Sequence, residues 1–190
     1  MYKLAFKVYR ESTHYVQGVQ NLCARVFGIV LFSLVALPLG VNAAEGSSSD
    51  YPRLNFSAGA IGIADSIDEP FLIGVEYQMP AFSDWALIPA VGFLYSQNGA
   101  GYVYGGLRHD FQLSDEWVLT PSLSAGYFDD SDEIDLGYAL EFRSGIEVAY
   151  KLPGKSRLGL GVFHISNASL GDRNPGTELM TLSWSMPIGN

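Results

Sequence analysis

The sequence has almost no cysteine and few basic residues. Its one cysteine, Cys23, lies near the N-terminus, and acidic side chains outnumber Lys and Arg by 20 to 11, for a net charge of −9 at pH 7. One cysteine excludes a disulfide framework within the chain. The acidic balance argues against nucleic acid as a partner, because surfaces that bind nucleic acid concentrate positive charge.

The sequence also lacks an apolar run long enough for a comfortable membrane-spanning helix. Residues 26–39 are apolar but contain Gly28 and Pro38, and a spanning helix needs about 20 such residues. Basic residues precede this run and the small-residue stretch 41–43 follows it, as in an export signal. We therefore expect residues 1–43 to be a signal peptide and 44–53 a linker. Residues 44–190 have 7 basic and 19 acidic side chains, a net charge of −12, and no cysteine.

The rest of the chain alternates between apolar and polar residues. WALIPAVGFLY (85–95) and WVLTPSLSAGY (117–127) nearly repeat each other, each opening on Trp and closing on Tyr. In residues 136–150, Glu141, Arg143 and Glu147 share one face, and the opposite face carries Leu136, Tyr138, Leu140, Phe142, Ile146, Val148 and Tyr150. Period-two alternation predicts β-strands with one apolar face and one charged face.

Strands with one apolar and one charged face are found in two architectures. In a soluble sheet the apolar face is covered, and in a membrane barrel it faces lipid while the charges line the lumen. No long amphipathic helix is available to cover a soluble sheet, and ten steps of a tilted strand cover roughly the 25 Å apolar band of an outer-membrane barrel. We predict an all-β fold, an eight-stranded antiparallel transmembrane β-barrel of the bacterial outer membrane over residues 54–190. A soluble β-sandwich or lipocalin-like barrel is the alternative. The predicted strands are 54–63, 71–78, 85–95, 101–111, 117–127, 136–150, 156–167 and 177–186.

One segment differs from its surroundings. FHISNASLGDRNPGTEL (163–179) places His164 two residues before Ser166 and Glu178 twelve residues after it. The predicted pairing puts these three side chains on the lipid-facing rows of strands seven and eight, at their outer ends. A serine needs a base to become a nucleophile, and a carboxylate can hold that base in the required tautomer.

Acyl transfer also needs donors for an oxyanion. The side chain of Asn174, that of Asn167, or loop amides around Gly176 are candidates. The plain alternative is that these are polar residues at a strand end, followed by an ordinary Asn-Pro-Gly turn.

The motif His164-Ile165-Ser166-Asn167, followed by Asn174-Pro175-Gly176-Thr177-Glu178, resembles the lipid A 3-O-deacylase family of PagL-type outer-membrane enzymes. The resemblance implies Ser166 as nucleophile, His164 as base, Glu178 as third triad member and Asn174 in the oxyanion hole, with no metal or cofactor. The implied reaction removes the ester-linked 3-hydroxyacyl chain at position 3 of lipid A. The acyl chain is then expected to contact Leu160, Val162, Met180 and Leu182.

The expected partners are lipid A or lipopolysaccharide as substrate and the lipid of the outer membrane. A homodimer is compatible with the resemblance, and no nucleic acid is expected. Two rival functions stay open from the residues themselves. One is a structural or adhesive barrel without activity, and the other is an esterase or phospholipase that acts on another lipid.

Overall fold

The structure is a computed structural model, which describes residues 50–63, 70–82 and 84–189. These residues belong to one compact unit, Val41–Asn190. The predicted signal peptide and most of the predicted linker lie outside the described residues. Within the described residues, no helix is long and apolar enough to cross a membrane.

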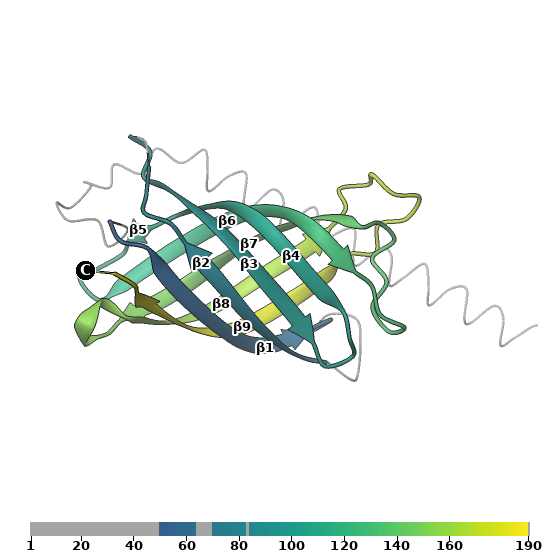
Figure 1. Ribbon diagram of the computed structural model, residues 1–190, viewed down its shortest axis with the longest axis horizontal. Helices are drawn as coiled ribbons and strands as arrows, with labels where there is room; N and C mark the ends of the chain where they lie inside the picture. The colour runs from purple at the N-terminus through teal and green to yellow at the C-terminus, as the bar shows by residue number, and fades with distance from the viewer. Residues whose placement is uncertain (1–49, 64–69, 83, 190) are drawn as a thin grey trace, which may run out of the picture. The chain divides into compact units, whose positions relative to one another are not determined.

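An antiparallel sheet closes on itself into a barrel (Figure 1). Eight long strands form the wall, because β1 pairs with both β2 and β9, and β4 pairs with β6. This arrangement confirms the predicted eight-stranded antiparallel barrel. A two-residue strand, β5, also pairs with β6. The elements are β1 Arg53–Ile61, β2 Phe71–Gln78, β3 Leu87–Ser96, β4 Gly101–His109, β5 Phe111–Gln112, β6 Trp117–Asp129, β7 Leu140–Lys151, the 3-10 turn η1 Pro153–Lys155, β8 Arg157–Ser166 and β9 Thr177–Pro187.

The distribution of apolar and charged side chains in the barrel is the reverse of that in a water-soluble protein. Large apolar side chains on its outer face are widely exposed, among them Val103 at 58%, Leu123 at 57% and Leu182 at 63%. Charged side chains such as Arg108 and Glu147 are instead buried at 6% exposure. An apolar outer face around a whole barrel is unfavourable in water and favourable in lipid. The outer wall is therefore the membrane-facing surface.

A network of ion pairs fills the lumen. Arg108 donates to Glu76 at 2.7 Å and to Glu147 at 3.1 Å, and Tyr104 donates to Glu76 at 2.9 Å. The Arg143 guanidinium lies 4.4 Å from the centre of the Tyr104 ring. A lumen pocket beside this network has a volume of about 20 Å³, which is room for about one water. The predicted lumen network therefore forms, with Glu76 and Arg108 as additional members.

Glu141 is an exception to the predicted network. It is fully buried on the lumen side of β7, but neither of its carboxylate oxygens has a hydrogen-bond partner among the described residues. The adjoining strand start also differs from the prediction, since β7 begins at Leu140 rather than at residue 136. Leu136 belongs to the preceding loop and is buried at 2% exposure, so it is not part of the lipid-facing row. Gly137 lies between Leu136 and the start of β7 at Leu140, and its positive φ of 83° is not a strand conformation.

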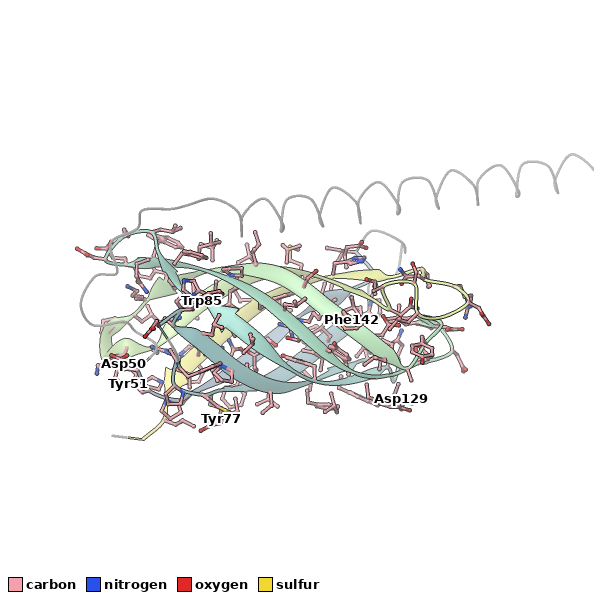
Figure 2. All side chains as sticks on the ribbon, turned by 90° about the horizontal axis from the view of Figure 1, so that it is seen from above. Asp50, Tyr51, Tyr77, Trp85, Asp129 and Phe142 are labelled. Atoms are coloured by element: carbon pink, nitrogen blue, oxygen red, sulfur yellow. The ribbon has the colours of Figure 1, made fainter. Side chains whose placement is uncertain are left out.

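Aromatic side chains mark one end of the wall. Tyr77 and Trp85 lie near the end where Asp50 and Tyr51 enter the barrel, and Asp129 lies at the opposite end (Figure 2). The predicted third strand opened on Trp85, but β3 begins only at Leu87, because Ala86 has a positive φ of 49°. We call the end with Tyr51 the terminal end. The other end, with Asp129, is called the loop end.

Candidate active site

The site begins with a cross-strand pair at the loop end of the barrel. His164 on β8 and Glu178 on β9 are directly opposite each other in the sheet. The His164 Nδ1 atom lies 3.2 Å from Glu178 Oε1. The two side chains are 14% and 21% exposed, so both are largely shielded yet reachable. A carboxylate at this distance fixes the tautomer and orientation of an imidazole.

Ser166 is the last residue of β8 and shares the face of His164, because residues i and i+2 of a strand point the same way. Their Cα atoms are therefore separated by roughly 6.6 Å along the strand. The three predicted residues of the polar trio, Ser166, His164 and Glu178, thus lie on one face of two neighbouring strands, and His164 and Glu178 are in contact. The trio lies on the outer, lipid-facing side of the wall.

Strand β7 supplies further neighbours of the site, beside those predicted from the sequence. Ser144 is opposite His164, and Phe142 is opposite Ser166. Ser144 is a small polar residue in an outward row that is otherwise apolar between Leu140 and Tyr150. Directly opposed side chains in antiparallel strands lie about 4.5–5.5 Å apart at Cβ. The polar exception in this row was the signal that could have identified Ser144 as a neighbour of the site.

Asn167 organises the loop that follows β8. Its side-chain amide nitrogen donates to the carbonyl oxygens of Leu136 at 3.0 Å and Arg173 at 2.9 Å, and its side-chain oxygen accepts from the Ser169 amide at 3.0 Å. Asn167 is fully buried. All of its side-chain capacity for donation therefore goes to the backbone of two loops.

Asn174 is held by the same residue. The backbone amide of Asn167 donates to Asn174 Oδ1 at 3.0 Å. This contact anchors the oxygen of the exposed Asn174 amide. The loop therefore holds the Asn174 amide beside the end of β8.

Gly176 packs against the imidazole from the loop side. A Cβ built on Gly176 would lie 2.9 Å from His164 Cε1 and 3.3 Å from His164 Nε2. Gly176 also has a positive φ of 69°. Any larger residue would meet both the ring and a strained backbone. Glu178 and Gly176 thus hold the imidazole from two sides.

The loop before β7 packs closely on the loop after β8. A Cβ on Gly137 would lie 2.9 Å from the carbonyl oxygen of Arg173, and one on Gly171 would lie 3.0 Å from the carbonyl oxygen of Gly137. The exposed side chains of Arg173 and Asp135 form an ion pair across the same contact. The two loops therefore support each other behind the site.

An apolar surface extends from the site along the outer wall. Leu160 is opposite Leu182, and Val162 is opposite Met180, on the same β8–β9 pair that ends in His164 and Glu178. Leu160, Met180 and Leu182 are 55%, 45% and 63% exposed. The four predicted acyl-contact residues thus form one continuous patch next to the polar trio.

Comparison with known proteins decides the family. The model of the family "Lipid A 3-O-deacylase (PagL)" matches residues 72–187, which is more than half of the chain and includes the whole polar trio. The chain belongs to the lipid A 3-O-deacylase family. Strand β1 precedes the matched segment, although the barrel needs it for closure.

A solved structure shares the fold of this lipid A deacylase family member. The crystal structure of the outer membrane enzyme PagL aligns with a TM-score of 0.57 at 19% identity, covering 72% of this chain and 99% of that one. Neisserial surface protein A aligns with a TM-score of 0.49 at 13% identity, covering 76% of this chain and 100% of that one. No curated protein matches the sequence.

Proposed function

We propose that this lipid A deacylase hydrolyses the ester-linked 3-hydroxyacyl chain at position 3 of lipid A, with Ser166 as nucleophile, His164 as base and Glu178 as its orienting carboxylate. The observation that carries the proposal is the 3.2 Å contact between His164 Nδ1 and Glu178 Oε1, on the face that also bears Ser166. A structural barrel has no need for a supported imidazole beside a serine in its lipid-facing wall.

The reaction proceeds in two halves. Ser166 Oγ attacks the ester carbonyl while His164 takes the hydroxyl proton, and the imidazolium then gives that proton to the departing sugar oxygen. The acyl group is now an ester of Ser166. Water attacks this ester, His164 again accepts and returns a proton, and the 3-hydroxy fatty acid leaves.

Asn174 is the proposed oxyanion donor in both halves. Its oxygen is anchored by the Asn167 amide, which supports the assignment of its nitrogen to the tetrahedral intermediate. A preorganised donor needs no reorientation when the charge forms. Asn167 then acts as a positioning residue, since its own amide nitrogen is engaged with the Leu136 and Arg173 carbonyls.

The substrate reaches this site from within the membrane. The trio lies on the outer wall, and the apolar patch of Leu160, Val162, Met180 and Leu182 runs from it toward the middle of the strands. A lipid that diffuses in the outer leaflet can lay one acyl chain on this patch while its ester meets Ser166. A homodimer through the apolar wall stays a prediction.

Mass spectrometry of lipid A tests the proposal. Cells that express the wild type are expected to lose the mass of one 3-hydroxyacyl chain, and cells that express Ser166→Ala are not. Ser156→Ala, in the turn at the terminal end, is the matched control and should behave as the wild type.

Two results would contradict the proposal. Unchanged lipid A, with wild-type protein shown folded in the outer membrane, would favour another lipid ester or a structural barrel. Loss of the chain with both the wild type and Ser166→Ala would remove Ser166 from the reaction.

A further inference from the structure

A second concave site lies at the terminal end of the barrel, away from the candidate active site. It is a pocket of about 210 Å³ between the start of β1 and the turn that joins β7 to β8. The pocket is ten times larger than the gap beside the lumen network, at about 20 Å³. Its lining consists of Tyr51, Arg53, Lys151, Leu152, Lys155 and Arg157.

Positive charge is concentrated in this pocket. Four of its six lining residues are Lys or Arg, in a chain whose net charge is −9. The other basic residues of segment 50–189 are Arg108 and Arg143 in the lumen network and Arg173 at the loop end. A cationic cluster in an acidic protein creates a local potential that attracts anions.

The lining cations differ in burial: two arginines are buried at the bottom of the pocket, and a lysine is exposed at its rim. Arg53 and Arg157 are only 3% and 6% exposed, whereas Lys155 is exposed on the turn. Planar guanidinium groups at a buried position suit bidentate binding of phosphate oxygens, and lysines add mobile point charges.

The existing contacts hold these side chains in place, and an acidic partner offsets one of the four positive charges. Arg157 donates to Asp110 Oδ2 at 2.7 Å, on a carboxylate that does not line the pocket. Lys151 Nζ donates to the backbone oxygen of Asp115 at 3.1 Å, and the Lys155 ammonium lies 4.2 Å from the centre of the Tyr51 ring. A carbonyl and an aromatic ring orient a cation without neutralising its charge.

We propose that this pocket binds a phosphate group, either of a phospholipid headgroup or of a free phosphate. Its volume is below the range of about 300–1,000 Å³ that is usual for sites of drug-sized ligands, so it suits a headgroup rather than a whole lipid. Arg53 and Arg157 are buried and alternate along their strands with outward residues such as Leu158, so the pocket lies on the lumen side of the wall, at the mouth of the terminal end. The site does not depend on the proposed hydrolysis.

Calorimetric titration of the full chain in a non-ionic detergent tests this site. Inorganic phosphate and short-chain phosphatidic acid are the two probes. Saturable binding of at least one of them is expected, and binding should weaken as the salt concentration rises. Binding of phosphatidic acid alone identifies a lipid headgroup as the ligand, and equal binding of both shows that the phosphate group suffices.

Two matched variants locate the binding. Lys155→Gln removes one positive charge from the exposed rim and should weaken binding at least 5-fold, whereas Arg173→Gln removes one positive charge at the loop end and should not change it. Arg53→Gln, checked for folding by its heat-dependent mobility in gels, should reduce binding further. The proposal is overturned if neither probe saturates, or if Lys155→Gln binds as tightly as the wild type.

Discussion

His164 and Glu178 face each other across the β8–β9 pair, with 3.2 Å between Nδ1 and Oε1. The hairpin loop between their strands carries Asn167, Asn174 and Gly176, so one supersecondary unit supplies every polar group of the proposed site. The rest of the barrel fixes the depth of this unit in the membrane. Substitutions at single residues can therefore change the activity without unfolding the barrel.

Replacing Glu178 by Gln should abolish most of the activity while keeping the barrel folded. The amide preserves the size of the side chain but loses the charge that stabilises an imidazolium, and it can favour the wrong tautomer of His164. Loss of about 10³-fold or more in kcat is expected, by analogy with serine hydrolase triads. Initial rates on lipid A in detergent micelles measure it. A rate within 3-fold of the wild type would remove Glu178 from the mechanism.

Gly176→Ala should impair catalysis by displacing the imidazole. The new Cβ would lie 2.9 Å from His164 Cε1, and small displacements of a catalytic group cost up to about 100-fold in rate. Gly154→Ala is the matched control, because Gly154 also has a positive φ, at 76°, but nothing lies within 4 Å of its Cβ position.

Both glycine variants should lose about 1 kcal/mol in the free energy of unfolding, since Ala at positive φ is strained. Only Gly176→Ala should lose at least 10-fold in kcat. Equal kinetic effects in the two variants would show that backbone strain, rather than contact with the imidazole, is responsible. Urea titrations and initial rates give the two quantities.

Leu160→Ala should reduce kcat/KM on lipid A by about 2- to 5-fold. The effect is modest because lipid is as apolar as leucine, so the acyl chain gains packing contacts rather than release from water. Leu123→Ala on β6 is the control, since Leu123 is exposed to nearly the same extent, 57% against 55%, on another part of the wall. An equal effect of both changes would contradict an acyl path along β8 and β9.

Asp110→Asn should destabilise the terminal end in a pH-dependent way. Burial alone would raise the pKa of Asp110, but Arg157, at 2.7 Å, and the Thr120 hydroxyl, at 2.8 Å, outweigh it and hold the pKa below its usual value. A depressed pKa in the folded state contributes stability above the unfolded value of about 3.9, and this stability is lost as the pH falls through the folded value.

The variant should therefore be less stable than the wild type at pH 7, by about 3 kcal/mol for a broken buried pair. The difference should shrink at strongly acidic pH, where the wild-type carboxyl is also neutral. Urea-induced unfolding at both pH values measures it. A difference that is independent of pH would show that charge at Asp110 is not the cause.

The sequence by itself determined the class of fold and the members of the candidate trio. Period-two alternation predicts strands whatever surrounds them, and the distance of two residues between His164 and Ser166 places both on one face. The family motif supplied the roles expected of these side chains. Strand ends were less certain, as Trp85 and Leu136 show, because tight backbone turns at Ala86 and Gly137 interrupt a pattern that continues in the sequence.

Only the tertiary structure decided which distant residues meet. The register of β7 against β8 places Ser144 opposite His164, and a residue 20 positions away along the chain leaves no local signal of that contact. The same holds for Asn167, whose hydrogen bonds join two loops, and for the four cations of the terminal pocket, which come from β1, the end of β7, the turn η1 and the start of β8. Closure of the sheet fixes these neighbours, because each strand has only one position and one register in which all hydrogen bonds of the barrel wall can be satisfied.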